Sequence, residues 1–149
     1  MRIYLYTDAS TMDKDAIGTA ILLTKSDCLN VVRKRYVVET PMEAEFLILY
    51  DALNYIMDNG IPCTQLLAYT DCESIVKMYQ KYKRTGNLPK DLNNKFVWKD
   101  FFNNMKNYDA TMKYAQSHSY INGSHTVNNS CDIVSKFIMR KVNKGEVDI

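Results

Sequence analysis

The fold is decided by the stretch RIYLYTDAS, residues Arg2–Ser10. Its first part is apolar and aromatic, which is typical of a central strand covered on both faces. The strand then runs into Asp8, and a buried carboxylate is costly unless a metal ion or another charge compensates it. The same ending returns in LLAYTD, residues Leu66–Asp71. Two apolar strands that each run into Tyr-Thr-Asp predict that Asp8 and Asp71 face each other.

The composition is that of an ordinary soluble domain. The chain has 149 residues, 46% of them hydrophobic and 24% charged, which predicts one domain with its own core. No apolar run reaches the roughly 18 residues of a membrane span, and no basic-then-apolar leader begins the chain. Four cysteines without CxxC spacing indicate reduced thiols, so we expect a cytoplasmic protein. A net charge of +2 requires any basic surface to be local.

The order of predicted elements indicates an α/β protein. Two further strands, linked by a short polar turn, follow the first strand and predict an antiparallel meander. Helices and strands then alternate, which predicts a mixed sheet with helices packed on it. We expect the domain to cover residues 1–142, followed by a flexible tail over residues 143–149. The predicted elements are strands at 17–24, 29–38, 65–70 and 112–116, and helices at 40–57, 72–83, 94–105 and 126–142.

The first predicted helix separates two neighbouring acids. Thr40 is a good N-cap, Pro41 suits the first helical position, and Glu43 completes a capping box. Capping therefore explains Glu43. Glu45 instead shares the apolar face that should meet the sheet (Leu49, Ala52 and Ile56), where a structural role is harder to find.

Four acids are candidates for one site: Asp8, Glu45, Asp71 and Asp132. Carboxylates suit Mg²⁺ or Mn²⁺, and several at one point cannot all ionise without cations between them. Two ions about 4 Å apart would activate water and stabilise the leaving oxygen of a phosphodiester. Taken alone, Asp71 is also a candidate N-cap for the next helix, and Asp132 a partner of a helix dipole.

A basic segment, Lys77–Lys90, carries cations interleaved with Tyr79 and Tyr82. Such a run is either a solvated helix face or a contact surface for a phosphate backbone. A polar segment that holds both histidines, His118 and His125, precedes the last predicted helix. A histidine on a loop near the acids could move protons at the leaving group.

The chain resembles type 1 ribonucleases H, members of the retroviral-integrase-like nuclease superfamily. Four segments carry the resemblance over roughly residues 2–142: Y-T-D-A-S at Tyr6–Ser10, T-P-M-E-A-E-F at Thr40–Phe46, Y-T-D-C-E-S at Tyr69–Ser74, and N-N-S-C-D at Asn128–Asp132. They are similar to the family's T-D-G-S, T-x-x-x-x-E, Y-T-D-S and N-x-x-x-D motifs. The second motif selects Glu45, in agreement with the helix-face argument.

The resemblance implies a ribonuclease H-like fold, a mixed five-stranded sheet with helices on both faces. It implies that Asp8, Glu45, Asp71 and Asp132 hold two Mg²⁺ ions, with Mn²⁺ as a possible substitute. The expected activity is endonucleolytic hydrolysis of the RNA strand of RNA–DNA hybrids, leaving 5′-phosphate ends, by a monomer that does not bind membranes. His118 resembles the family's loop histidine, and His125 is the alternative.

The resemblance also assigns substrate contacts. Thr40 and Asn94 fall where the family binds a phosphate of the DNA strand, and Tyr82 where an aromatic residue lines the DNA channel. Asn128 would contact RNA near the cut. The segment Lys77–Lys90 is similar to a shortened basic protrusion, whose expected contacts are Lys81, Lys83 and Arg84.

Three departures from the family pattern concern substrate choice. Ala9 stands where glycine is usual, and a turn without glycine follows the first strand. Pro41 and Met42 stand where paired asparagines often contact RNA 2′-hydroxyls, the group that distinguishes RNA from DNA. Two alternatives therefore accompany the ribonuclease H hypothesis: a related nuclease with altered strand preference, and a non-catalytic module that binds hybrids.

Overall fold

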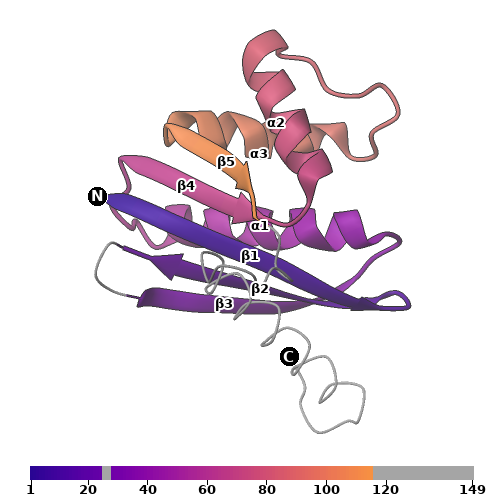
Figure 1. The fold of residues 1–149 in the computed structure, drawn as a ribbon, viewed down its shortest axis with the longest axis horizontal. Helices are drawn as coiled ribbons and strands as arrows, with labels where there is room; N and C mark the ends of the chain where they lie inside the picture. The colour runs from indigo at the N-terminus through magenta and orange to yellow at the C-terminus, as the bar shows by residue number, and fades with distance from the viewer. Residues whose placement is uncertain (25–27, 116–149) are drawn as a thin grey trace, which may run out of the picture.

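The computed structural model of the protein describes residues 1–24 and 28–115. The predicted five-stranded mixed sheet is confirmed, with strand order β3-β2-β1-β4-β5 (Figure 1). The helix predicted at residues 126–142 and the tail at 143–149 lie outside the described residues. The described elements are β1 (Arg2–Met12), β2 (Asp15–Leu23), β3 (Cys28–Val37), α1 (Pro41–Asp58), β4 (Gln65–Thr70), α2 (Glu73–Thr85), α3 (Lys95–Asn107) and β5 (Ala110–Tyr114).

The central strand, β1, is longer than the sequence predicts. It pairs antiparallel with β2 through Met12, and a two-residue turn at Asp13 and Lys14 replaces the predicted longer turn. Asp13 adopts the left-handed conformation with φ of 54°, which asparagine and aspartate tolerate better than most residues. On its other side β1 pairs parallel with β4 only as far as Tyr6. Among the described strands, β1 therefore has a neighbour on one side only from Thr7 onward, because the ladder with β4 stops at Tyr6 (Figure 1).

The predicted boundaries of α1 are confirmed within one residue. The Thr40 hydroxyl accepts a hydrogen bond from the Glu43 N–H at 3.3 Å, and the helix ends at Asn59 with Gly60 at φ of 59°. The Glu43 carboxylate accepts from the N–H of Glu39 instead of that of Thr40, so the capping box is shifted by one residue.

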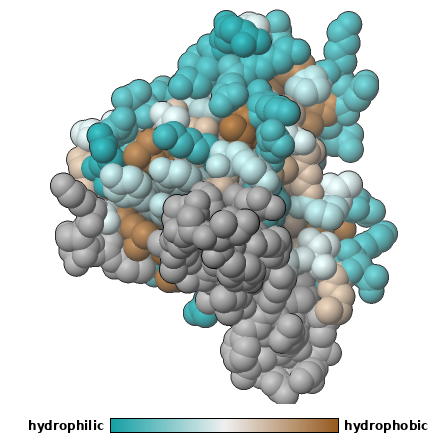
Figure 2. Space-filling model, viewed as in Figure 1, coloured by the Kyte–Doolittle hydropathy of each residue, from teal (hydrophilic) through white to brown (hydrophobic). Residues whose placement is uncertain are grey.

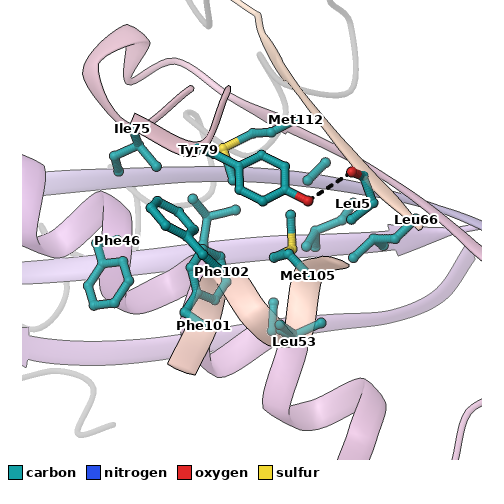
Figure 3. Close-up of a cluster of buried hydrophobic side chains, with 14 of the residues drawn as sticks. Leu5, Phe46, Leu53, Leu66, Ile75, Tyr79, Phe101, Phe102, Met105 and Met112 are labelled. Atoms are coloured by element: carbon teal, nitrogen blue, oxygen red, sulfur yellow. Dashed lines mark hydrogen bonds between the residues drawn. The ribbon is translucent and has the colours of Figure 1, made fainter. Parts of the chain in front are cut away.

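One core joins the helices to one face of the sheet (Figure 3). Phe46 of α1 stacks on Trp98 of α3 with ring centroids 3.7 Å apart, and both rings are buried in the core. The Tyr79 hydroxyl donates to the Ala110 carbonyl at 2.9 Å and ties α2 to β5. Each large side chain buried here contributes about 1.5–3 kcal/mol. Strand β5 begins two residues earlier than predicted, at Ala110.

Gly18 sets how closely α1 lies on the sheet. A Cβ at this position would lie 2.7 Å from the Ile48 Cβ, closer than carbon atoms pack. A glycine inside a strand typically marks a bulge or a close backbone approach. Gly18 serves close approach, because the register shift between β2 and β3 falls at Leu22/Leu23. None of the described helices is long and apolar enough to cross a membrane.

Candidate active site

Three carboxylates meet beside β1, at the end of β4. Asp8 comes from β1, Asp71 follows the last residue of β4, and Glu45 lies in the second turn of α1. One oxygen from each lies within 4.8 Å of the others, and Asp8 and Glu45 are buried. We call these three residues the carboxylate cluster. The prediction that Asp8 and Asp71 face each other is therefore confirmed.

The two Tyr-Thr-Asp triplets bring Asp8 and Asp71 to the same level. Tyr6 and Tyr69 are the last partners in the parallel register, so the following residues of each triplet lie side by side. The Thr7 hydroxyl donates to the Tyr69 carbonyl at 3.3 Å and links the two strands where their pairing stops. The N-cap of α2 is Cys72, so the alternative reading of Asp71 as an N-cap is wrong.

The environment of Glu45 disfavours its ionised form. Its side chain is buried, and burial raises its pKa well above the ordinary value of 4.5. The charges of Asp71 and Asp8 and a carboxyl–carboxyl hydrogen bond to Asp71 raise the pKa further. The Ala9 N–H donates to Glu45 Oε1 at 3.1 Å, and this hydrogen bond lowers the Glu45 pKa. The sequence argument that sorted Glu45 from Glu43 is confirmed, because Glu45 is buried at the sheet while Glu43 lies near the surface.

The donor set fits a divalent cation. All three residues offer carboxylate oxygens, the ligands that Mg²⁺ and Mn²⁺ prefer. The second oxygen of Glu45, Oε2, is buried, and no N–H group of the described residues donates to it. A cation at this point would supply that missing partner and offset the repulsion that raises the Glu45 pKa.

Thr40 and Asn94, the predicted phosphate contacts, line one cleft between the first turns of α1 and α3, with a volume of about 610 Å³. The floor of the cleft is apolar, and its lining includes three acids, Glu39, Glu43 and Asp91. Neither lysine nor arginine is among the described lining residues. We call it the acidic cleft. Thr40 and Asn94 lie together in it, but the negative charge of its acids opposes the binding of a phosphate.

The predicted contacts of α2 divide into buried and exposed residues. Tyr82 is only 4% exposed and its hydroxyl donates to Asn103 at 2.7 Å, which corrects its assignment to a DNA channel: it belongs to the core. Lys83 donates to the Ala110 carbonyl at 3.4 Å and lies over the Tyr79 ring. Lys81 and Arg84 are exposed, so they retain the surface position that substrate contact requires. Hydrophilic residues dominate the surface over α2 in Figure 2.

Four predicted site residues lie outside the described part of the chain: Asp132, His118, its alternative His125, and Asn128. Their roles stay predictions.

One group that the structure places in the site, a backbone N–H, was not identified from the sequence. The Ala9 backbone N–H holds Glu45 Oε1, a contact that no side-chain motif indicates. The sequence holds no signal for this contact, because it depends on where the β1–β4 ladder stops, at Tyr6 and Tyr69.

A mixed sheet of this order, with one carboxylate on the central strand and a second just after the neighbouring parallel strand, defines a nuclease-like protein of the ribonuclease H fold. A family model described as RNase H matches residues 1–138. The chain therefore belongs to the RNase H family, which confirms both the resemblance seen in the sequence and the assignment as a ribonuclease H enzyme.

Solved structures show the same fold. The protease–reverse transcriptase of prototype foamy virus matches with a TM-score of 0.73 and 19% identity over 99% of this chain, which spans 21% of that longer chain. RNase H1 of the halophilic archaeon Halobacterium salinarum has a TM-score of 0.69 and 14% identity, covering 95% of this chain and 99% of its own. LC11-RNase H1, isolated from compost, has in its complex with an RNA/DNA hybrid a TM-score of 0.68 and 14% identity, covering 90% and 94%. No curated protein sequence matches the chain.

Proposed function

We propose that this protein hydrolyses the RNA strand of RNA–DNA hybrids, endonucleolytically and with two Mg²⁺ ions. The observation that carries the proposal is the carboxylate cluster, whose oxygens lie within 4.8 Å of one another. Membership of the RNase H family supports the same chemistry. The similar LC11-RNase H1 was solved in complex with an RNA/DNA hybrid, which supports this substrate class.

In this proposal Asp8, Glu45 and Asp71 hold the cations, and Asp132 completes the set. Bound divalent ions supply an activated water and stabilise the leaving oxygen of the phosphodiester. The chain itself holds the ligands in place. The Ala9 N–H orients Glu45, and the Thr7 and Thr70 hydroxyls fix the strand ends that carry Asp8 and Asp71. His118, or His125 in its place, would move the proton at the leaving group.

The proposed binding surface for the hybrid is a local basic patch, because the chain as a whole has a net charge of only +2. Lys81 and Arg84 are exposed on α2, which begins two residues after Asp71. Lysine and arginine at such positions bind phosphates and make affinity dependent on salt.

The test is cleavage of a hybrid labelled on either strand, in Mg²⁺, in Mn²⁺ and in EDTA. We expect cleavage of the RNA strand with either metal and none in EDTA. Asp71→Asn and Glu45→Gln should abolish cleavage, and Asp58→Asn, an exposed acid at the end of α1, should retain it. A folded wild-type protein that leaves the hybrid intact with both metals would overturn the proposal. Binding without cleavage in Mn²⁺ would favour the non-catalytic hybrid-binding module.

A nuclease with altered strand preference is the second candidate, and the first turn of α1 favours it. Pro41 lacks an N–H, and the apolar Met42 packs against the core, so neither side chain offers a donor to a 2′-hydroxyl. Cleavage rates on hybrid, duplex RNA and duplex DNA separate the two candidates. A strong preference for the hybrid would exclude altered preference.

A further inference from the structure

The hydroxyl of Ser10 is a buried polar group without a hydrogen-bond partner among the described residues. A buried hydroxyl that makes no hydrogen bond destabilises the fold, and native proteins keep few such groups. Asp8, two residues before Ser10 on the same strand, belongs to the carboxylate cluster. A buried hydroxyl without a partner in the described part of the chain, two residues from a member of that cluster, therefore needs an explanation.

Ser10 lies two residues beyond Asp8 on β1, so both side chains point to the same face of the sheet. Across the strand pair Ser10 faces Ile17 and Asp8 faces Thr19, and both of these β2 residues are fully buried. Ile17 is apolar and offers no hydrogen bond. The hydroxyl thus lies in a closed environment whose nearest charged neighbour along the strand is a predicted metal ligand.

The spacing fits one intervening water molecule. Residues two apart on a strand are separated by about 6.8 Å between Cα atoms. A cation–water bond of about 2.1 Å followed by a hydrogen bond of about 2.8 Å reaches up to about 4.9 Å from a cation at Asp8 to a hydroxyl oxygen. Water bound to a divalent cation is a strong hydrogen-bond donor, and the Ser10 oxygen can accept from it.

We propose that Ser10 is a positioning residue of the metal centre: its hydroxyl accepts a hydrogen bond from a water ligand of the cation held by Asp8. The inference rests on the proposed function, because it presumes that the carboxylate cluster binds a divalent cation. Groups that orient the ligands of a metal typically change metal affinity by about 10- to 100-fold when they are removed. The hydroxyl is retained at a cost to the metal-free fold because it acts when the cation is bound.

The experiment measures Mn²⁺ binding by calorimetry on the full chain without nucleic acid, together with thermal melts in EDTA. Ser10→Ala should weaken Mn²⁺ binding at least about 10-fold, while its melting temperature in EDTA stays at or above that of wild type. Ser10→Thr keeps the hydroxyl and should bind Mn²⁺ more tightly than Ser10→Ala. The control is Ser74→Ala, an exposed serine in the first turn of α2, which should bind as wild type does.

Two results would overturn the role of Ser10. One is Mn²⁺ affinity of Ser10→Ala within twofold of wild type. The other is a lower melting temperature of Ser10→Ala in EDTA, or its failure to fold, because either would indicate a structural hydroxyl. Wild-type protein that binds no Mn²⁺ would instead overturn the proposed function, so the two failures are distinguishable.

Discussion

Tyr6 and Tyr69 are register partners in neighbouring parallel strands, and their rings stack with centroids 4.6 Å apart and planes 8° apart. This pair is the last in the β1–β4 ladder, because β4 ends one residue later while β1 continues. Parallel pairing aligns the two Tyr-Thr-Asp triplets residue by residue. The repeated triplet in the sequence therefore places the carboxylates of Asp8 and Asp71 next to each other.

The Thr70 hydroxyl holds the turn that carries Asp71. It accepts a hydrogen bond from the Cys72 N–H at 3.2 Å, and Thr70 is fully buried. Thr70→Val keeps the shape of the side chain but leaves that N–H without its acceptor, so we expect a loss of about 1–3 kcal/mol in the free energy of unfolding. Because Asp71 lies inside this turn, hybrid cleavage should fall as well.

Urea denaturation and a cleavage assay check the Thr70 prediction. Thr85→Val is the matched control, since the Thr85 hydroxyl donates to the Lys81 carbonyl at the exposed end of α2. The control should change stability by less than about 0.5 kcal/mol and leave cleavage unchanged. Wild-type stability in Thr70→Val would contradict the prediction.

The raised pKa of Glu45 predicts how stability depends on pH without metal. The folded protein keeps the Glu45 proton above pH 4.5, where the unfolded chain releases it. Folding therefore binds protons in this window, and the metal-free protein should lose stability as pH rises from about 4.5 through the folded pKa. Mg²⁺ should restore stability at the upper end, because the cation replaces the proton.

Thermal melts from pH 5 to pH 8, in EDTA and in Mg²⁺, test this dependence. Glu45→Gln cannot release the proton, so its metal-free stability should fall less steeply with pH than that of wild type. Equal pH dependence of the two proteins in EDTA would refute the assignment of this effect to Glu45.

Close packing of α1 on β2 positions Glu45, so Gly18→Ala should affect both stability and activity. The added Cβ would lie 2.7 Å from the Ile48 Cβ and would force α1 away from the sheet. We expect a loss of about 1–3 kcal/mol, the usual cost of overpacking a core. Cleavage should fall beyond this loss, because Ile48 lies one turn from Glu45.

The control for Gly18 is another glycine. Gly60 has φ of 59° and no atoms near an added Cβ, so Gly60→Ala should destabilise through its backbone alone and leave cleavage by the folded protein unchanged. Full activity of folded Gly18→Ala would show that the helix position is not critical.

The acidic cleft predicts that reversing one of its charges strengthens substrate binding. Asp91 is an exposed lining residue, so Asp91→Lys should be tolerated by the fold. We expect a lower Kd for hybrid and a steeper dependence of log Kd on log salt, by about one unit for each added phosphate contact. Asp58→Lys makes the same charge change at the other end of α1. Equal effects of the two variants would mean that only net charge matters.

Local patterns predicted most of the described elements. Strand β4 has the predicted boundaries, and the caps of α1 at Thr40 and Asn59 agree with the motif. The predicted end of the first strand, at Asp8, was wrong. Thr11 and Met12 are held in β1 by pairing with Ala16 and Asp15, which no local propensity indicates. The resemblance assigned Tyr82 to a DNA channel, whereas its ring is buried and packs against Phe102 in the core.

The sequence by itself determined which residues carry the chemistry. The repeated Tyr-Thr-Asp singled out Asp8 and Asp71 on two strands, and helical periodicity separated Glu45 from Glu43, because both signals depend only on spacing along the chain. Only the tertiary structure decided that these three acids meet within 4.8 Å, that the Ala9 N–H donates to Glu45, that the Ser10 hydroxyl is buried, and that acids line the cleft at Thr40 and Asn94. The physical reason is that burial, repulsion between carboxylates and the charge of a cleft depend on distances between segments far apart in the chain.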